Sequence, residues 1–234
     1  MYMLVNSNNN IHVADGNFEL KMADHVLSRT KTYKYLGLIL DEKFSWADHI
    51  NEVCWKLSQA AGVIFKVRKL LSTDALMLIY HTLVGQKLRY GLICWATSSK
   101  FLLNKINVIH NKIVRYLTFS KACSRADPLY RKLDLLQLDL LIELKWDKFM
   151  YKFENDMLPG AFNDYFKKPN HHHRTRYSVQ KNFEQTRITK NRDKSLLKYI
   201  GPKKWSELPL SIKESSSLKI FKQSFRSHLI DTYD

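Results

Sequence analysis

The stretch TYKYLGLILDEKFSWADHI, residues 32–50, decides how the chain is divided. Its first part, residues 34–40, is a nearly continuous apolar run, which predicts a strand covered on both faces. The acidic pair Asp41-Glu42 follows, and Ser45 with Asp48 loosely fits a helix-capping box that has Asp in place of the usual Glu. We therefore predict a strand, a charged turn and the start of a helix at this corner.

The pattern of apolar residues changes at this corner, and the change indicates the fold class. Upstream, residues 11–20 could form a hairpin around Asp15-Gly16, a pair that tolerates the positive φ of a tight turn. Downstream, apolar residues recur at helical spacing. We predict a mainly α protein, with a small N-terminal β element (residues 1–44), a helical bundle (45–160) and a basic, partly irregular tail with short helices (161–234).

Capping residues and apolar stripes locate the expected helices. Caps are expected at Ser72 or Thr73, at Ser98 or Ser99, at Asp127-Pro128 and at Ser217, and a longer helix should run from about 138 to 158. The residues that these helices should turn inward are Ile50, Val53, Cys54, Leu57, Ala61, Ile64 and Leu71; then Leu76, Ile79, Tyr80 and Leu83; then Leu102, Ile106, Ile109, Ile113 and Leu117; and finally Ile220, Phe221, Phe225 and Leu229.

The composition indicates the kind of partner. The chain has 38 Lys and Arg against 22 Asp and Glu, a net charge of +16, so we expect a polyanion or an acidic surface, bound less tightly as salt rises. Three widely spaced cysteines, Cys54, Cys94 and Cys123, lack metal-ligand spacing and indicate reduced core thiols in an intracellular protein, cytoplasmic or nuclear. No apolar run of roughly 18 residues predicts a membrane span.

Candidate catalytic groups all have simpler explanations. The run His171-His172-His173 lacks the spacing of metal ligands and is better explained as loop histidines or phosphate contacts. Asp41-Glu42 could hold Mg²⁺, but a turn between strand and helix explains the pair. Cys94 could be a nucleophile, but its apolar surroundings favour a core thiol. The residues therefore support no catalysis by this chain alone.

Basic residues near the ends of two expected helices form a candidate binding surface. They lie off the apolar stripes, so they should be exposed, and both helices pack on one bundle, so their charged flanks could border one groove. Arg174 and Arg176, in the polar stretch 167–194, could wrap the same nucleic-acid backbone. The alternative is a solvated charged surface. The residues of this predicted basic face are Lys66, Arg68, Lys69, Lys112 and Arg115.

Several motifs occur in an order that resembles a known family. They are KYLGLILDEKFSWADHI (34–50), LRYGLICW (88–95), INVIHNKIVR (106–115), DPLYRKLDLLQL (127–138) and the terminal GPKKWSELPLSIKESSSLKIFKQSF. Together they resemble the end of the palm and the thumb of non-LTR (LINE-type, jockey-like) retrotransposon reverse transcriptases. The resemblance covers nearly the whole chain, with His110 where Gln is usual and Ser206 where Asn is common.

This resemblance implies roles for the predicted segments. Residues 1–44 would be the last palm strands and 45–160 the thumb, and Tyr35, Leu36 and Gly37 would match the primer-grip turn that holds the primer 3′ end. The family's polymerase carboxylates lie upstream of the Lys-Tyr-Leu-Gly strand, and this sequence contains no Asp-Asp pair. Mg²⁺ would belong to that upstream palm active site, so we expect no cofactor in this chain and no polymerase activity.

Two hypotheses for function follow. The first is a non-catalytic C-terminal fragment of a retrotransposon RNA-directed DNA polymerase that binds primer-template or element RNA through basic helical faces. Its partners would be an RNA or DNA duplex and the remainder of the polymerase, and no membrane. The second is a helical protein-interaction module whose basic faces meet acidic partners.

Overall fold

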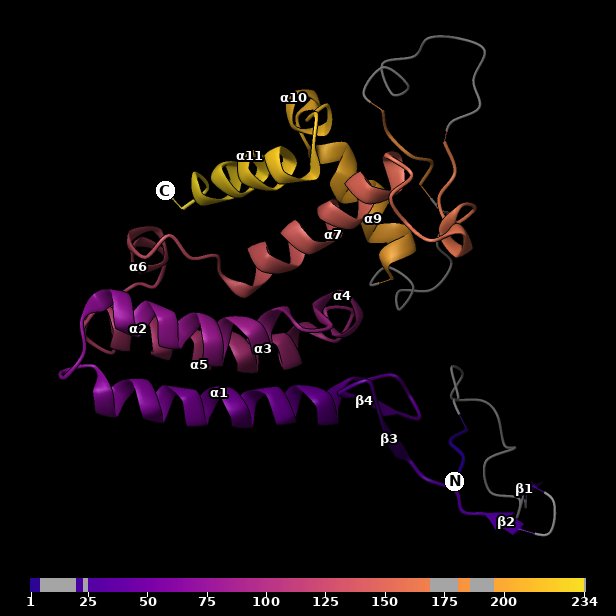
Figure 1. Ribbon diagram of the computed structural model, residues 1–234, viewed down its shortest axis with the longest axis horizontal. Helices are drawn as coiled ribbons and strands as arrows, with labels where there is room; N and C mark the ends of the chain where they lie inside the picture. The colour runs from indigo at the N-terminus through magenta and orange to yellow at the C-terminus, as the bar shows by residue number, and fades with distance from the viewer. Residues whose placement is uncertain (5–19, 23–24, 169–180, 186–195, 234) are drawn as a thin grey trace.

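The computed structural model describes residues 1–4, 20–22, 25–168, 181–185 and 196–233. Small antiparallel hairpins come first, and helices form nearly all the regular structure after them, as the predicted mainly α fold requires (Figure 1). Strand β1 (Leu20–Met22) pairs with β2 (His25–Leu27). The hairpin predicted around Asp15-Gly16 lies outside the described residues. No helix in the described part of the chain is long and apolar enough to cross a bilayer.

The apolar run at residues 34–40 is not the single covered strand that we predicted. It is split between β3 (Thr32–Tyr35) and β4 (Leu38–Asp41), which pair antiparallel with Tyr35 opposite Leu38. Leu36 and Gly37 have φ values of 46° and 80°, as a two-residue turn with both central residues in the left-handed region requires. Strand β3 is exposed along its length because the turn folds it back over β4, away from the helices.

Helices α1 (Ala47–Val67) and α5 (Lys100–Leu117) form the centre of the bundle. Both bury a stripe at helical spacing, including Ile50, Leu57 and Ile64 on α1. The predicted cap at Ser99 is confirmed, because its side chain accepts a hydrogen bond from the Leu102 N–H. The predicted stripe was wrong at Leu71, which lies beyond the end of α1 and is exposed.

The second predicted helix is continuous but changes its winding. It comprises α2 (Thr73–Ile79), a π-helical stretch (Tyr80–Gly85) and α3 (Gln86–Arg89), and Ser72 caps it as expected. The wider π turns shift the inward face by one residue. Leu83 is therefore 40% exposed, contrary to our prediction, and Val84 is fully buried in its place.

The C-terminal helices return to the bundle through α7 (Leu138–Glu154). Helices α9 (Leu197–Glu207) and α11 (Leu218–Ile230) both contact α7, with the short α10 (Leu210–Lys213) between them (Figure 1). Buried rings join the elements, among them Trp205, Phe221 and Phe225. Helix α7 ends four residues before the predicted position, and Ile220 is exposed rather than inward.

Two short connecting helices complete the bundle, and one of them lacks the predicted cap. Helix α4 (Leu92–Trp95) contacts α7, and α6 (Asp127–Lys132) begins with Pro128 in its first turn but has no side-chain cap. The three cysteines are free. Cys94 and Cys123 are exposed, so the interpretation of these two as core thiols was wrong.

Polar side chains are buried where the π-helical stretch, α5 and α6 meet. His110 is fully buried, and its Nε2 lies 2.8 Å from the Tyr80 hydroxyl. Tyr130 donates to the Asn111 side-chain oxygen at 2.9 Å. Burial, with a smaller contribution from Arg89, lowers the pKa of His110 to about 3, so the ring stays neutral in the folded protein.

The pKa of His110 predicts a pH-dependent stability. Above pH 6.5 the ring is neutral in both the folded and unfolded states, so its contribution is constant. As the pH falls from 6.5 towards 3, only the unfolded state takes up the proton, and stability should fall by up to about 1.4 kcal/mol per pH unit. H110Q, which keeps a hydrogen-bonding group beside Tyr80, should have a shallower slope in urea unfolding between pH 4 and 7.

The exposed His25 provides a matched control for this measurement. H25Q should keep the wild-type dependence on pH, because it removes a histidine without altering the buried network. Equal slopes for the wild type and H110Q would contradict the proposed role of the buried ring.

Candidate nucleic-acid interface

The carboxylate of Asp41 organises the corner between hairpin and helix. Its Oδ1 accepts hydrogen bonds from the N–H groups of Lys43 and Ser45, both at 3.0 Å, and its Oδ2 accepts from the Trp46 N–H at 2.8 Å. Ser45 Oγ adds a fourth, at 3.2 Å. Partial burial raises the pKa of Asp41, but the hydrogen bonds outweigh this effect and hold the pKa below its usual value.

These bonds replace the capping box that we predicted. Trp46, not Ser45, is the residue before α1, and it adopts a left-handed conformation with φ 64°. The Ser45 N–H, which Asp48 would accept in the predicted box, donates to Asp41 instead. Asp41 therefore acts as the turn residue that the sequence indicated, and it also orients the chain into the helix.

The 35–37 turn is held from behind by Tyr90, Gly91 and Trp95. The Tyr90 hydroxyl donates a hydrogen bond to the Leu36 carbonyl. Gly91 has φ 58°, and a Cβ at this position would lie 2.6 Å from a methyl carbon of Leu38, so a side chain there would strain the backbone and displace Leu38. Trp95 is fully buried, and its Nε1 donates to the Tyr90 carbonyl at 2.9 Å. The LRYGLICW motif thus supports the hairpin turn.

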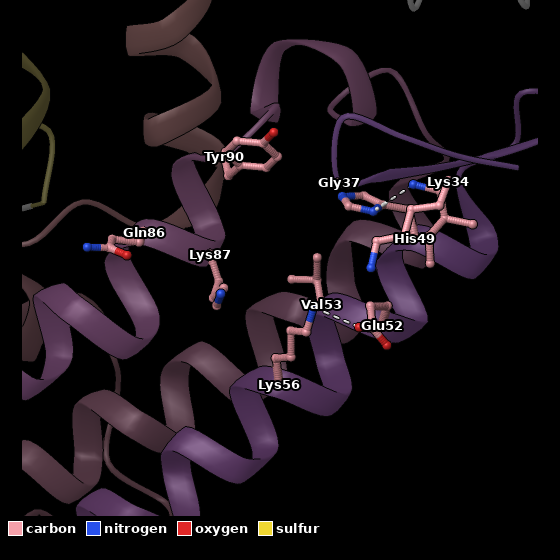
Figure 2. A pocket seen from close by; sticks show the side chains of 10 residues that line it. Lys34, Gly37, His49, Glu52, Val53, Lys56, Gln86, Lys87 and Tyr90 are labelled. Atoms are coloured by element: carbon pink, nitrogen blue, oxygen red, sulfur yellow. Dashed lines mark hydrogen bonds and ion pairs between the residues drawn. The ribbon is translucent and has the colours of Figure 1, made fainter.

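A pocket of about 290 Å³ opens between this hairpin, α1 and α3 (Figure 2). His49, buried on α1, accepts a hydrogen bond at Nδ1 from the Ile39 N–H at 3.4 Å. Its Nε2 has no hydrogen-bond partner among the described residues. Burial lowers the pKa of His49, and the nearby Lys56 lowers it further, so the ring is neutral near pH 7.

Three of the four charged side chains that line this pocket are lysines. Lys34 comes from the hairpin, Lys56 from α1 and Lys87 from α3, and Glu52 is the carboxylate among the lining side chains (Figure 2). Glu52 pairs with Lys56 at 2.7 Å, one helical turn away. Lys34 and Lys87 belong to no ion pair within the described part of the chain. The pocket can therefore attract an anionic group next to the turn.

Apolar side chains are exposed at the tip of the hairpin. Leu36 is 72% exposed and Tyr35 58% exposed, whereas the backbone of the turn is fixed by Tyr90. The predicted grip residues Tyr35, Leu36 and Gly37 therefore form an outward-facing tip whose backbone is anchored by Tyr90. Sequence reasoning located this tip by family motif, but it did not identify the three lysines behind it.

The structure brings together only part of the predicted basic face. The Arg68 guanidinium lies 4.5 Å from the ring centre of Phe65 and 5.4 Å from that of Tyr116. Lys112 approaches the Tyr116 ring at 5.8 Å, and both Phe65 and Lys112 line a shallow pocket between α1 and α5. Arg68 and Lys112 are therefore neighbours, as predicted, with aromatic rings between them.

The other predicted cations differ in their surroundings. Lys66 and Lys69 are exposed at the end of α1. Arg115 is half-buried, and its Nε donates to the Ser124 carbonyl at 3.0 Å, so it stabilises a loop. Arg174 and Arg176 lie outside the described residues. In the part that the structure describes, no group of three or more His, Cys, Asp or Glu side chains could hold a metal ion.

Comparison with known proteins finds sequence similarity to enzymes of mobile elements. The chain is 28% identical over 126 residues, 53% of its length, to the RNA-directed DNA polymerase from mobile element jockey of Drosophila funebris. It is 25% identical over 113 residues (47%) to the probable RNA-directed DNA polymerase from transposon BS of Drosophila melanogaster, and 26% over 105 residues (44%) to that from transposon X-element of the same species.

About half of this chain is therefore similar in sequence to RNA-directed DNA polymerases of jockey-type mobile elements. The matched segments cover only 12–13% of the length of these relatives. No protein-family model and no solved structure matches the chain. Three of the motif segments quoted from the sequence meet in space, because the KYLG turn, the Trp46–His49 helix start and the Tyr90–Trp95 segment enclose one corner of the structure.

The cap at this corner can be tested by substitution. D41A should lower the free energy of unfolding by about 1–2 kcal/mol, because three backbone N–H groups lose their acceptor. D41N, which keeps an acceptor oxygen, should cost less. S45A should cost only a few tenths of a kcal/mol, because it removes only the hydrogen bonds of the exposed Ser45 hydroxyl. Urea unfolding at pH 7 measures all three, and a larger loss for S45A than for D41A would restore the capping-box interpretation.

Proposed function

We propose that this chain is a nucleic-acid-binding segment of a non-LTR retrotransposon reverse transcriptase. In this proposal residues 1–44 are the last palm-like strands, residues 45–160 act as the thumb and residues 161–234 form a basic tail. The exposed tip at Tyr35, Leu36 and Gly37 contacts the primer strand. The relatives, all RNA-directed DNA polymerases of mobile elements, support this hypothesis rather than a protein-interaction module.

The observation that carries the proposal is the conformation of Leu36. A leucine at φ 46° costs about 1–2 kcal/mol relative to an ordinary conformation. This side chain gains little from burial, since it is 72% exposed. Strained residues of this kind cluster at sites that contact ligands. An outward leucine beside Tyr35, with Lys34 behind it, fits contact with the sugar and base of a strand end and with its phosphate.

The two basic regions are separated by the length of α1. The pocket with Lys34 lies at the start of this helix, and Arg68 with Lys112 lies at its end. Twenty-one residues of α-helix span about 31 Å, close to nine base pairs at about 3.4 Å each. A duplex along α1 could therefore meet both regions, with the primer end at the hairpin.

We further propose that this chain binds without catalysing nucleotide transfer. Two-metal catalysis needs carboxylates that converge on Mg²⁺, and the family resemblance places them upstream of the Lys-Tyr-Leu-Gly strand. The purified chain should therefore extend no primer with Mg²⁺ or Mn²⁺. Template-dependent incorporation by a preparation free of other polymerases would contradict this.

A substitution at the hairpin tip should change nucleic-acid binding and protein stability in opposite directions. L36N should raise the free energy of unfolding by roughly 0.5–1 kcal/mol, since asparagine tolerates the left-handed region. The same change should reduce the preference for a recessed 3′ end over a blunt duplex about fivefold, the equivalent of about 1 kcal/mol of apolar contact. Urea unfolding and fluorescence anisotropy measure the two effects. A stabilised variant with unchanged preference would place the primer contact elsewhere.

The far end of α1 can be tested in the same titrations. Replacing Lys66, Lys69 and Lys112 by Glu should lower the slope of log affinity against log salt by about 0.9 for each phosphate that the protein no longer neutralises. Arg68 is left intact because it packs on aromatic rings. A matched control replaces the exposed Lys100, Lys121 and Lys203 by Glu, with the same change in net charge. Equal affinities and slopes for the two variants would mean that this surface does not touch the duplex.

A further inference from the structure

A second basic cavity lies between α3, α7 and α11, on the opposite side of α2 and α3 from α1 (Figure 1). It has a volume of about 460 Å³, larger than the pocket at the hairpin. Its floor is apolar and includes Leu141 and Leu144 of α7. Among the residues that the structure describes, no carboxylate lines it. Six cations line this α7–α11 groove: Arg89, Lys145, Lys148, Lys219, Lys222 and Arg226.

The spacing of these residues explains how the groove forms. Lys145 and Lys148 are three residues apart on α7, and Lys219, Lys222 and Arg226 are three and four apart on α11, so each set lies on one face of its helix. Because α7 and α11 pack together, the two faces border one cavity. Arg89 completes it from α3, where its guanidinium lies over Gly85, 3.3 Å from the position of an added Cβ.

The charges in the groove are poorly compensated. Arg226 pairs with Asp134 at 2.9 Å, but the other five cations take part in no ion pair within the described residues. Burial lowers the pKa of Lys145, and Lys148, Arg89 and Lys222 lower it further. Burial also lowers the pKa of Lys148, with Lys152 and Lys222 contributing. Like charges at this helical spacing destabilise the folded protein, and a bound polyanion would reverse that effect.

We propose that the α7–α11 groove binds consecutive phosphates of a single nucleic-acid strand, with a sugar or base against its apolar floor. Lysines on facing helices can contact a phosphate chain from both sides, and the cavity is large enough for more than a phosphate alone. The identity of the partner rests on the proposed function. The site itself is separate from the hairpin tip and from the α1–α5 face, and it uses none of their residues.

The test compares two triple variants with the same reduction in positive charge. The groove variant carries K148Q, K219Q and K222Q, and the control variant carries K100Q, K121Q and K203Q. The probe is a labelled six-nucleotide single-stranded RNA, measured by fluorescence anisotropy over a range of salt. The groove variant should lose at least tenfold in affinity relative to the control. Its slope of log affinity against log salt should fall by about 2, from about 0.7 for each of three phosphate contacts.

Thermal unfolding provides an independent readout. Without ligand, the groove variant should melt at a higher temperature than the control, because repulsion among the cations is relieved. The hexanucleotide should raise the melting temperature of the wild type and the control but not of the groove variant. If the groove variant is folded and binds the hexanucleotide within twofold of the control, the proposal is overturned.

Two further arms identify the ligand and separate this inference from the proposed function. Inorganic tripolyphosphate is titrated in parallel, and tighter binding of it than of the hexanucleotide, with the same lysine dependence, would overturn the assignment to a strand. The Lys66, Lys69 and Lys112 variant should bind the hexanucleotide like the wild type. If duplex binding proves independent of the hairpin and of α1, but the groove variant still loses the hexanucleotide, the proposed duplex contacts fail and the groove stands.

Discussion

The hydrogen bonds to the Asp41 carboxylate fix the direction in which the chain leaves the hairpin. One side chain accepts hydrogen bonds from three backbone N–H groups of the turn, at residues 43, 45 and 46, and the last of these is the residue before α1. Trp46 follows this corner in a left-handed conformation, and its ring is buried. The centre of that ring lies 6.2 Å from the centre of the His49 ring, and the His49 ring lies at the same distance from the Trp95 ring. Since α5 and the hairpin both pack on α1, the position of the whole bundle relative to the tip depends on this turn.

The parts of the fold that sequence predicted are those set by local chemistry. Ser72, Ser99 and Ser217 each cap a helix through a single hydrogen bond a few residues away, and the sequence signal for such a cap is local as well. Predictions failed where distant packing overrode the local pattern. The π-helical stretch exchanged Leu83 for Val84, and a leucine at φ 46° concealed a turn that is usually signalled by Asn or Gly.

The candidate sites were harder to predict than the helices, because their residues come from distant segments. Residues 121–160 have seven basic and seven acidic side chains, so their net charge is zero. This balance conceals that the basic and acidic side chains of α7 lie on different faces of the helix. Lys145 and Lys148 line the groove, whereas Glu143 pairs with Lys204 of α9 at 3.4 Å. A net charge counted along the sequence adds the charges of all faces of a helix and so does not reveal a face that is basic. Only the packing of α7 against both α9 and α11 separates them.

The support of the hairpin by Tyr90 also has a consequence for biosynthesis. An isolated two-stranded hairpin is marginal in water, and the hydroxyl that anchors this one lies 54 residues after Leu36. At about 5–20 residues per second, the ribosome needs roughly 3–10 s to make that interval. During this time the hairpin lacks the Tyr90 hydroxyl that anchors Leu36, and the apolar Leu38 of β4 lacks its neighbour Gly91. Codon usage between the hairpin and residue 95 therefore sets how long this segment is available for misassociation, independently of how stable the finished protein is.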